Sequence, residues 1–333
     1  MDSFDFRKKL LIALLSLAIV LVAAKILLQD KVGFSSSDIS VNENEIRQRF
    51  GDILNEFSID PKLIKERRIV DKSSGKEISN YKIQVPKDLT IPEILTEVYQ
   101  TYLKDSLKII SVEKVKNGKT IVLIKNGDDV LLNCELDYSK TYTRNKGYVS
   151  FIIKDSDPAN SISIRLLESS EKINFLLRPS SSLINQLETI QNYGQQFSVL
   201  IDDDINEQKY ELDPAHSAVR IATVIKTLVA DFEKAVCFIV DDNSSFYKSS
   251  NFKIFNQELS KRKINLFTTS EFLNLNDDET LVNSFNTEIE ELNRGGSIIF
   301  MMSEEAYFSV VPEIKKFKKQ GYRFIASSLI LHN

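Results

Sequence analysis

Histidine and cysteine are scarce in this chain of 333 residues, which contains two of each and no tryptophan. The two histidines, His216 and His332, are too few for a histidine-rich metal site. His216 follows Asp213-Pro214 in a predicted loop, and His332 lies next to the end of the sequence, where we expect no structural role. Each cysteine, Cys134 and Cys237, lies in an apolar strand pattern of a different predicted domain. We therefore expect buried free thiols rather than a disulfide.

Basic residues are not in excess, because 43 Lys and Arg stand against 47 Asp and Glu and give a net charge of −4. This balance, with no basic stripe, argues against a nucleic-acid-binding protein. Glycine-rich phosphate loops are also missing, since Gly295-Gly296 is predicted to end a helix before a strand. No Gly-x-Ser-x-Gly sequence is present, so a serine-hydrolase mechanism has no support.

One long apolar run is present near the N-terminus, at residues 10–28 (LLIALLSLAIVLVAAKILL). At about 1.5 Å per residue it covers most of a bilayer core of about 30 Å, which predicts a transmembrane helix. Arg7, Lys8 and Lys9 precede it, so residues 1–9 should be cytoplasmic and the bulk of this single-pass chain extracytoplasmic, periplasmic or extracellular. A cleavable signal peptide is the alternative. Residues 29–44 are polar and serine-rich, as in a linker.

Residues 45–138 have the pattern of a small α+β domain, for which we expect a ferredoxin-like arrangement. Apolar residues from Ile46 to Phe57 recur at helical spacing, and Thr90-Ile91-Pro92-Glu93 resembles a capping box that begins a second helix. A strand pattern at 81–85 precedes this second helix. Strand patterns at 107–115, 119–125 and 130–136 follow it, joined by predicted hairpin turns. The segment has no His or Cys cluster, so an interaction or spacer module is the favoured interpretation.

After a polar linker at 139–147, residues 148–333 alternate strand and helix patterns. Such repetition predicts a parallel sheet or a (β/α) barrel, with any site at the carboxyl ends of the strands. Polar clusters follow the predicted strands: 154–157 (Lys-Asp-Ser-Asp), 178–181 (Arg-Pro-Ser-Ser), 202–204 (Asp-Asp-Asp), 241–244 (Asp-Asp-Asn-Ser) and 303–305 (Ser-Glu-Glu). Carboxylates bind hard cations and accept hydrogen bonds from sugar hydroxyls, which predicts a cation or glycan site. Ordinary solvation of loops is the alternative explanation.

The order of these motifs resembles the divergent polysaccharide deacetylase family, over about residues 148–331. YVSFIIKDSD resembles the opening strand with its Asp-Asp pair, and VCFIVDDNSS stands where the family has Phe-Val-Asp-Ser-Arg-Thr. The segment RGGSIIFMMSEEAYFSVVPEIKKFKKQGYRFIA is similar to the final strand, helix and strand. The resemblance implies a partial or distorted (β/α) barrel of the deacetylase type and hydrolase-like carbohydrate metabolism in the cell envelope.

The resemblance also implies a divalent metal, such as zinc, held by an aspartate and two histidines, and here the match fails. The aspartate pair is Lys154-Asp155, the Asn-His-x-Gly-Ser segment is absent, and Met302-Ser303-Glu304 replaces a late Gly-His-Pro. Asp155 and Asp241 stand at the matching acidic positions, and two carboxylates alone make a poor zinc site. Lys154 would repel a cation beside Asp155, or form an ion pair with it.

The favoured hypothesis is therefore a membrane-anchored pseudoenzyme that binds an envelope polysaccharide, peptidoglycan or an envelope protein without a cofactor. Its candidate glycan-binding residues are Asp204, Asp241, Asn243 and Ser303. A second hypothesis is an active deacetylase with Asp155 as its catalytic candidate and a metal held by Asp155, Asp241 and Asp204. A third assigns the function to the α+β domain as a protein-interaction module.

Overall fold

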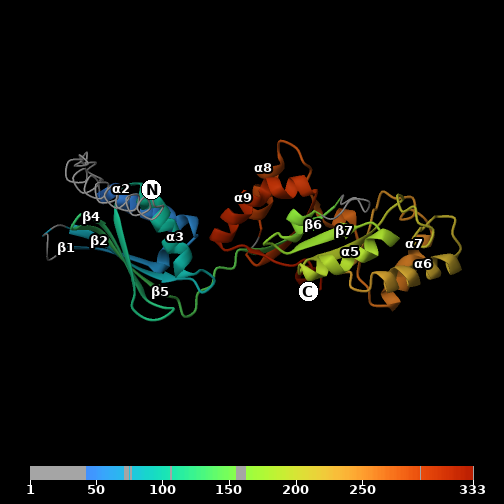
Figure 1. The fold of residues 1–333 in the computed structure, drawn as a ribbon, viewed down its shortest axis with the longest axis horizontal. Helices are drawn as coiled ribbons and strands as arrows, with labels where there is room; N and C mark the ends of the chain where they lie inside the picture. Colours follow the sequence, from blue (N-terminus) through green and yellow to red (C-terminus); the bar gives the residue numbers. More distant parts are fainter. Residues whose placement is uncertain are drawn as a thin grey trace, which may run out of the picture. The chain divides into compact units, whose positions relative to one another are not determined.

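The computed structural model describes residues 43–70, 75, 77–105, 107–154, 163–292 and 294–332. The chain divides into two units, Met1–Gln48 and Arg49–Asn333, and the contacts discussed below lie within the second. None of the helices in the described residues is long and apolar enough to cross a membrane. The predicted transmembrane helix at residues 10–28 lies outside the described residues, so it stays a prediction. Figure 1 shows two sheets, each with its own helices.

The first sheet has the order β1-β2-β5-β4-β3 and is mostly antiparallel, with β2 and β5 parallel. Its strands are β1 (Ile64–Val70), β2 (Glu77–Val85), β3 (Lys108–Glu113), β4 (Thr120–Asn126) and β5 (Asp129–Tyr138). Its helices are α2 (Glu43–Glu56) and α3 (Ile91–Tyr102), with short 3-10 turns η1 (Pro61–Leu63) and η2 (Leu103–Asp105). Phe50 of α2 packs on Tyr81 of β2 with ring centroids 5.1 Å apart, so the second half of α2 lies against this sheet.

The capping box that begins α3 is confirmed. Thr90 Oγ1 accepts from the backbone N–H of Glu93 at 3.4 Å, and the Glu93 carboxylate accepts from the backbone N–H of Thr90 at 2.8 Å. The ferredoxin-like prediction is wrong, because β1 pairs with β2 as a hairpin and α3 is the helix that connects strands within the described sheet. The missed strand β1 is almost wholly exposed, so it lacks the alternation that marks a half-buried strand.

The second sheet is all parallel, as predicted, in the order β10-β9-β8-β7-β6-β12-β11, with β13 also pairing to β6. Its strands are β6 (Gly147–Ile153), β7 (Ile173–Leu177), β8 (Gln196–Ile201), β9 (Phe238–Val240), β10 (Leu266–Thr268), β11 (Leu273–Asn274), β12 (Gly296–Met302) and β13 (Arg323–Phe324). The helices are α4 (Ile164–Leu167), α5 (Ser181–Asn192), α6 (Ala218–Asp231), α7 (Asn251–Lys261), α8 (Leu281–Glu290), α9 (Glu304–Gln320) and α10 (Ser328–Leu331), with the 3-10 turn η3 (Thr269–Glu271).

This second sheet curls. Its edge strands, β10 and β11, are joined directly through η3, from Thr268 to Leu273. Five peptide steps reach about 18 Å at most, whereas strands about 4.8 Å apart from β10 to β11 would span about 29 Å if laid flat. The two edges must therefore turn toward each other. The result is a half-barrel, which confirms the predicted partial (β/α) barrel at the level of architecture.

Two apolar layers hold the half-barrel together. On the convex face, Phe151, Phe175, Val199 and Phe300 pack against the helices in one large buried cluster. On the concave face, a smaller buried cluster contains Ile152, Leu176, Ile239, Ile299, Met301, Cys237 and Phe272. Alternate residues of each strand thus face opposite layers, which is why the strands are apolar almost throughout. Both cysteines are buried free thiols, as predicted.

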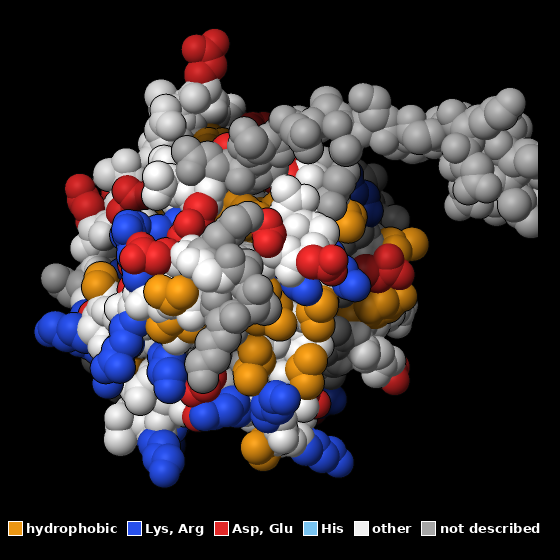
Figure 2. Space-filling view, turned by 90° about the vertical axis from the view of Figure 1, so that its left-hand side faces the viewer, with side chains coloured by type: hydrophobic (Ala, Val, Ile, Leu, Met, Phe, Trp, Pro, Cys, Tyr) orange, Lys and Arg blue, Asp and Glu red, His pale blue; other side chains and the backbone are white. Residues whose placement is uncertain are grey.

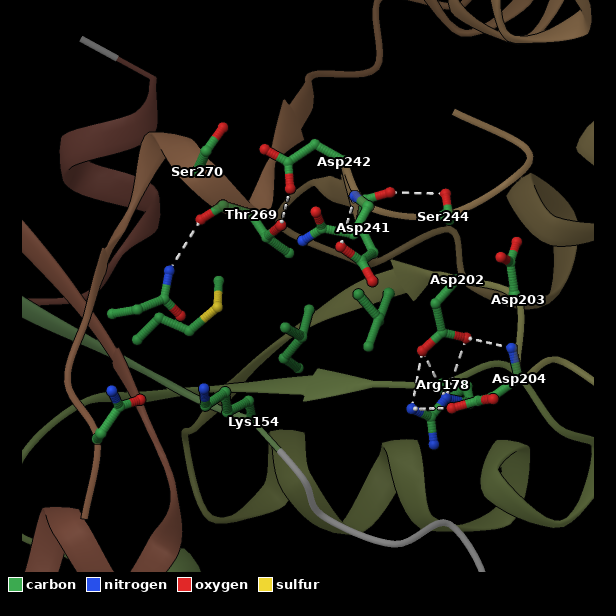
Figure 3. Close-up of a pocket in the computed structure, with 16 residues that line it drawn as sticks. Lys154, Arg178, Asp202, Asp203, Asp204, Asp241, Asp242, Ser244, Thr269 and Ser270 are labelled. Carbon is green, nitrogen blue, oxygen red and sulfur yellow. Dashed lines mark hydrogen bonds and ion pairs between the residues drawn. The ribbon is translucent and has the colours of Figure 1, made fainter. Parts of the chain in front are cut away.

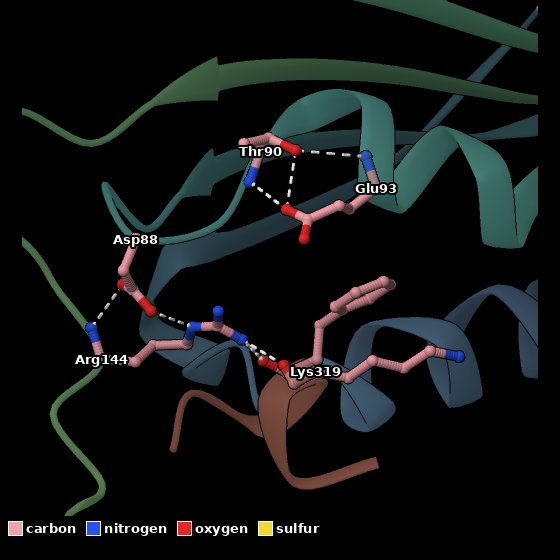
Figure 4. Close-up of polar contacts among 6 residues, drawn as sticks. Asp88, Thr90, Glu93, Arg144 and Lys319 are labelled. Atoms are coloured by element: carbon pink, nitrogen blue, oxygen red, sulfur yellow. Dashed lines mark hydrogen bonds and ion pairs between the residues drawn. The ribbon is translucent and has the colours of Figure 1, made fainter. Parts of the chain in front are cut away.

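Arg144 lies between the two sheets in sequence and joins their elements through hydrogen bonds (Figure 4). Its Nε donates to the Asp88 carboxylate at 2.8 Å, and its Nη1 donates to the carbonyl oxygens of Phe57, at 2.6 Å, and Lys319. The Arg144 side chain is 4% exposed. Gly321, with φ of 101°, ends α9 against it, and a Cβ there would lie 2.8 Å from Arg144 Cβ. A side chain at this turn would therefore clash.

Candidate functional site

A pocket of about 670 Å³ opens at the carboxyl ends of the half-barrel strands (Figure 3). This is the edge at which the strand-end clusters were predicted to converge. The pocket is lined by Lys154, Leu176, Arg178, Leu200, Asp202, Asp203, Asp204, Asp241, Asp242, Asn243, Ser244, Thr269, Ser270, Asn274, Asn276 and Met301. Four of the five predicted clusters contribute to it.

Arg178, directly after β7, is bound by carboxylates from the turn after β8. Its Nε donates to both oxygens of Asp202, at 2.8 and 3.1 Å, and its Nη2 lies 2.8 Å from Asp202 Oδ2 and 3.3 Å from Asp204 Oδ2. Burial raises the pKa of Asp202, although the Arg178 guanidinium opposes that rise. Asp202 is a buried carboxylate with a cationic partner, whereas the side chain of Asp204 is 76% exposed.

The other pocket carboxylates are bound by neighbouring loops. Asp203 accepts from the backbone N–H of Ser245 at 2.7 Å and from its hydroxyl at 2.9 Å, and these bonds lower the pKa of Asp203. Asp242 accepts from the Thr269 hydroxyl at 2.8 Å, and hydrogen bonds from Ser270 and Thr269 lower the pKa of Asp242. Asp241 Oδ1 accepts from the backbone N–H of Asn243 at 2.9 Å. These contacts fix the shape of the β8 and β9 loops.

Lys154 is the first residue after β6, and its backbone N–H donates to the Met302 carbonyl at 2.9 Å. Figure 3 shows its side chain on the side of the pocket away from Arg178, Asp202 and Asp204. Within the described part of the chain, its ammonium group makes no hydrogen bond or ion pair, in contrast to Arg178. Leu176, Leu200 and Met301 add apolar surface to the lining.

Three of the predicted site residues, Asp204, Asp241 and Asn243, line the pocket. Asp155, the catalytic candidate, lies outside the described residues. Ser303 is not among the lining residues, and its hydroxyl instead accepts from the backbone N–H of Ala306 at 3.1 Å and caps α9. A serine directly after a strand can either cap the next helix or contact a ligand, so the sequence alone does not distinguish a cap from a site residue.

Neither histidine lines the pocket. His216 Nδ1 accepts from the backbone N–H of Asp213 at 3.2 Å, so this imidazole holds a loop turn. His332 Nε2 lies 3.3 Å from the Val236 carbonyl, although no structural role was expected for it. In the segment before it, the Ser327 hydroxyl lies 2.7 Å from that of Ser150 in β6.

The donor side chains of the described residues do not fit the divalent metal of the family that the sequence resembles. Among the described residues, no group of three or more His, Cys, Asp or Glu side chains could hold a metal ion. Asp202 and Asp204 face the Arg178 guanidinium, which would repel a cation placed between them. Asp241 is the described member of the predicted ligand pair, and its Oδ1 is already bonded to the loop.

Sequence reasoning missed the side of the pocket formed by η3 and β11, namely Thr269, Ser270, Asn274 and Asn276. The run Thr268-Thr269-Ser270 after a strand is a polar cluster of the kind found at the other strand ends. Asn274 and Asn276 carried no such signal, because β11 is two residues long and has no periodicity of its own. No family model and no curated protein matches this chain.

The small sheet has a second surface of interest on the face opposite its helices. Strand alternation and register place Ile110 and Val112 of β3 beside Leu123 and Ile121 of β4 on this face. Val112 is 43% exposed. In the end-on view of Figure 2, hydrophobic side chains lie among Lys and Arg side chains. Ile110, Ile121 and Leu123 are half-buried, so Val112 is the most exposed residue of this apolar strip.

Proposed function

We propose that this chain is a membrane-anchored envelope protein whose half-barrel binds a glycan in the pocket at the carboxyl ends of its strands. The observation that carries the proposal is the chemistry of the pocket lining. Carboxylates, amides and hydroxyls surround a cavity of about 670 Å³, with apolar side chains among them. Sugar rings present hydroxyls to polar groups and C–H surface to apolar ones, and a hydrogen bond to a carboxylate is about twice as strong as a neutral one.

Binding is better supported than metal-dependent deacetylation. A metal centre needs ligand oxygens that converge and are free to coordinate. Here Asp202 is bonded to Arg178 by both oxygens, and Asp203 is bonded to Ser245. The lone pairs that these carboxylates have left, and the second oxygen of Asp241, can accept hydrogen bonds from the hydroxyls of a glycan.

The anchor rests on the apolar run at residues 10–28 and the basic residues before it. Tethering keeps a weakly binding pocket at high local concentration near an envelope surface. Removal of residues 1–30 should move the chain from the membrane fraction to the soluble fraction of the cell. Recovery of the shortened chain with the membranes would contradict the anchor.

The glycan proposal is tested by isothermal titration calorimetry of the full-length chain with an N-acetylglucosamine tetramer and with soluble peptidoglycan fragments. We expect binding of at least one probe. Asp241→Ala should weaken that binding by about tenfold, since about 1.4 kcal/mol of charge-assisted hydrogen bonding is lost. Asp128→Ala is the matched control, because Asp128 is an exposed carboxylate in the turn between β4 and β5.

Acetate release is measured in the same samples, with and without added zinc. Absence of binding to every probe, or equal binding by the Asp241 variant and the wild type, would contradict the proposal. Zinc-dependent release of acetate would favour the deacetylase hypothesis instead. Unfolding curves of each variant show whether a loss of binding reflects a loss of fold.

A further inference from the structure

The cations of the pocket differ in what they already bind. Arg178 contacts two carboxylates, Asp202 and Asp204, within 3.3 Å. Lys154 lines the same pocket and is half-buried, and its ammonium group makes no hydrogen bond or ion pair with any described residue. A half-buried ammonium group has lost part of its hydration, and a ligand oxygen can replace the lost contacts. Lys154 is therefore the cation available to a ligand.

The charges of the pocket limit what that ligand can be. Two cations and five carboxylates are present among the described lining residues, so a densely anionic ligand would be repelled. Arg178, Asp202 and Asp204 form one cluster, and Figure 3 shows Lys154 on the opposite side of the pocket from that cluster. A single negative group can thus contact Lys154 while uncharged hydroxyls face the carboxylates.

Building on the proposed glycan function, we infer that the pocket selects an acidic saccharide, with one carboxylate on a sugar unit placed against the Lys154 ammonium. The hydroxyls of that unit then face Asp241 and the amide side chains of Asn243, Asn274 and Asn276. A uronic acid, or an amino sugar with a carboxylated ether substituent, has this chemistry. Lys154 is the specificity-determining residue, and the carboxylates recognise hydroxyls.

The test uses two probes that differ only in their two carboxylates. One is a tetrasaccharide of alternating glucuronate and N-acetylglucosamine, and the other is its carboxyl-reduced form. The full-length chain should bind the acidic probe about tenfold more tightly at low salt, and this preference should shrink as salt is added. Lys154→Met should abolish the preference, and Lys154→Arg should retain most of it, because the charge is kept.

Lys226→Met is the matched control, since Lys226 is an exposed lysine of α6 outside the pocket lining. Equal affinity of the wild type for the two probes would overturn the inference and leave the glycan function standing. An acidic preference that persists in Lys154→Met would overturn the assignment to this residue. Failure of both probes to bind, while the N-acetylglucosamine tetramer or the peptidoglycan fragments bind, would also overturn the inference. Failure of all these glycans to bind would contradict the proposed function itself.

Discussion

At the residue scale, the pocket depends on a buried carboxylate and the guanidinium beside it. Asp202 is 8% exposed, so its charged form is costly without Arg178. Burial has the larger effect and raises the pKa of Asp202, while Arg178 limits the rise. Asp203, one residue on, is bonded by loop N–H and hydroxyl groups, and its pKa is lowered. Adjacent residues of the same type therefore have different chemistry.

Arg178→Met should destabilise the chain by about 1–3 kcal/mol at pH 7, less than for a wholly buried pair because Arg178 is a third exposed. An acid whose folded pKa is raised weakens folding as pH rises above its unfolded pKa, near 4. Without Arg178 the folded-state pKa of Asp202 rises further, so the ionised carboxylate at pH 7 destabilises the variant more. Relative to the wild type, the variant should therefore lose less stability near pH 4 than at pH 7. Urea unfolding at both pH values measures this difference.

The control is the same substitution in an Asp202→Asn background. There the variant should show no such dependence on pH, because the titrating group is gone. An equal loss of stability at pH 4 and pH 7 in the single variant would mean that Arg178 acts through packing rather than through Asp202.

At the scale of elements, serine and threonine residues after strands and loops begin several helices. Thr90 caps α3, Ser180 caps α5, Ser217 caps α6 and Ser303 caps α9. Each side chain accepts from a backbone N–H in the first turn, which satisfies a donor that the helix itself cannot pair. Ser180 and Ser303 follow β7 and β12, so their caps fix where α5 and α9 leave the strand ends at which the pocket opens.

Ser303→Ala should lower the stability of the chain by about 1 kcal/mol, because the cap of α9 is lost. It should leave glycan affinity unchanged, since Ser303 is not a lining residue. Thermal unfolding and calorimetry measure the two effects. Ser309→Ala is the control, because its hydroxyl lies on the exposed face of α9 and donates to the Glu305 carbonyl in the same helix. A weaker affinity in the Ser303 variant would restore it as a glycan contact.

At the scale of the whole molecule, Arg144 connects segments that are far apart in sequence. Its partners belong to the loop after β2, the turn after α2 and the end of α9. Lys319 adds a 2.5 Å ion pair with Glu97 of α3. The buried guanidinium is satisfied by a carboxylate and backbone carbonyls, and its removal leaves those groups unpaired.

Arg144→Met should destabilise the chain by about 2–4 kcal/mol, because Asp88 and two carbonyl oxygens lose their donor. In scanning calorimetry we expect a single transition for the wild type and separate transitions for the two sheets in the variant. Lys146→Met is the control, since Lys146 is an exposed residue of the same linker. A single transition at the wild-type temperature in Arg144→Met would show that these bonds do not couple the two sheets.

The sequence by itself determined the features that depend on local pattern. Apolar runs of strand length alternating with amphipathic helices predicted the parallel sheet, and Thr90 to Glu93 predicted a cap that the structure confirms. Polar residues after those strands predicted where the pocket would lie, because the carboxyl ends of parallel strands meet at one edge. Two histidines already argued against a histidine-rich metal site.

Tertiary structure decided the rest, because it depends on contacts between distant segments. Only the fold shows that Asp202 is bonded to Arg178, while the Lys154 ammonium group has no partner among the described residues. All three are charged residues that follow strands. Only the fold brings Asn274 and Asn276 to the pocket, since β11 is too short to have a pattern. The direction of each carboxylate is set by packing and pairing across the sheet, which sequence spacing does not encode.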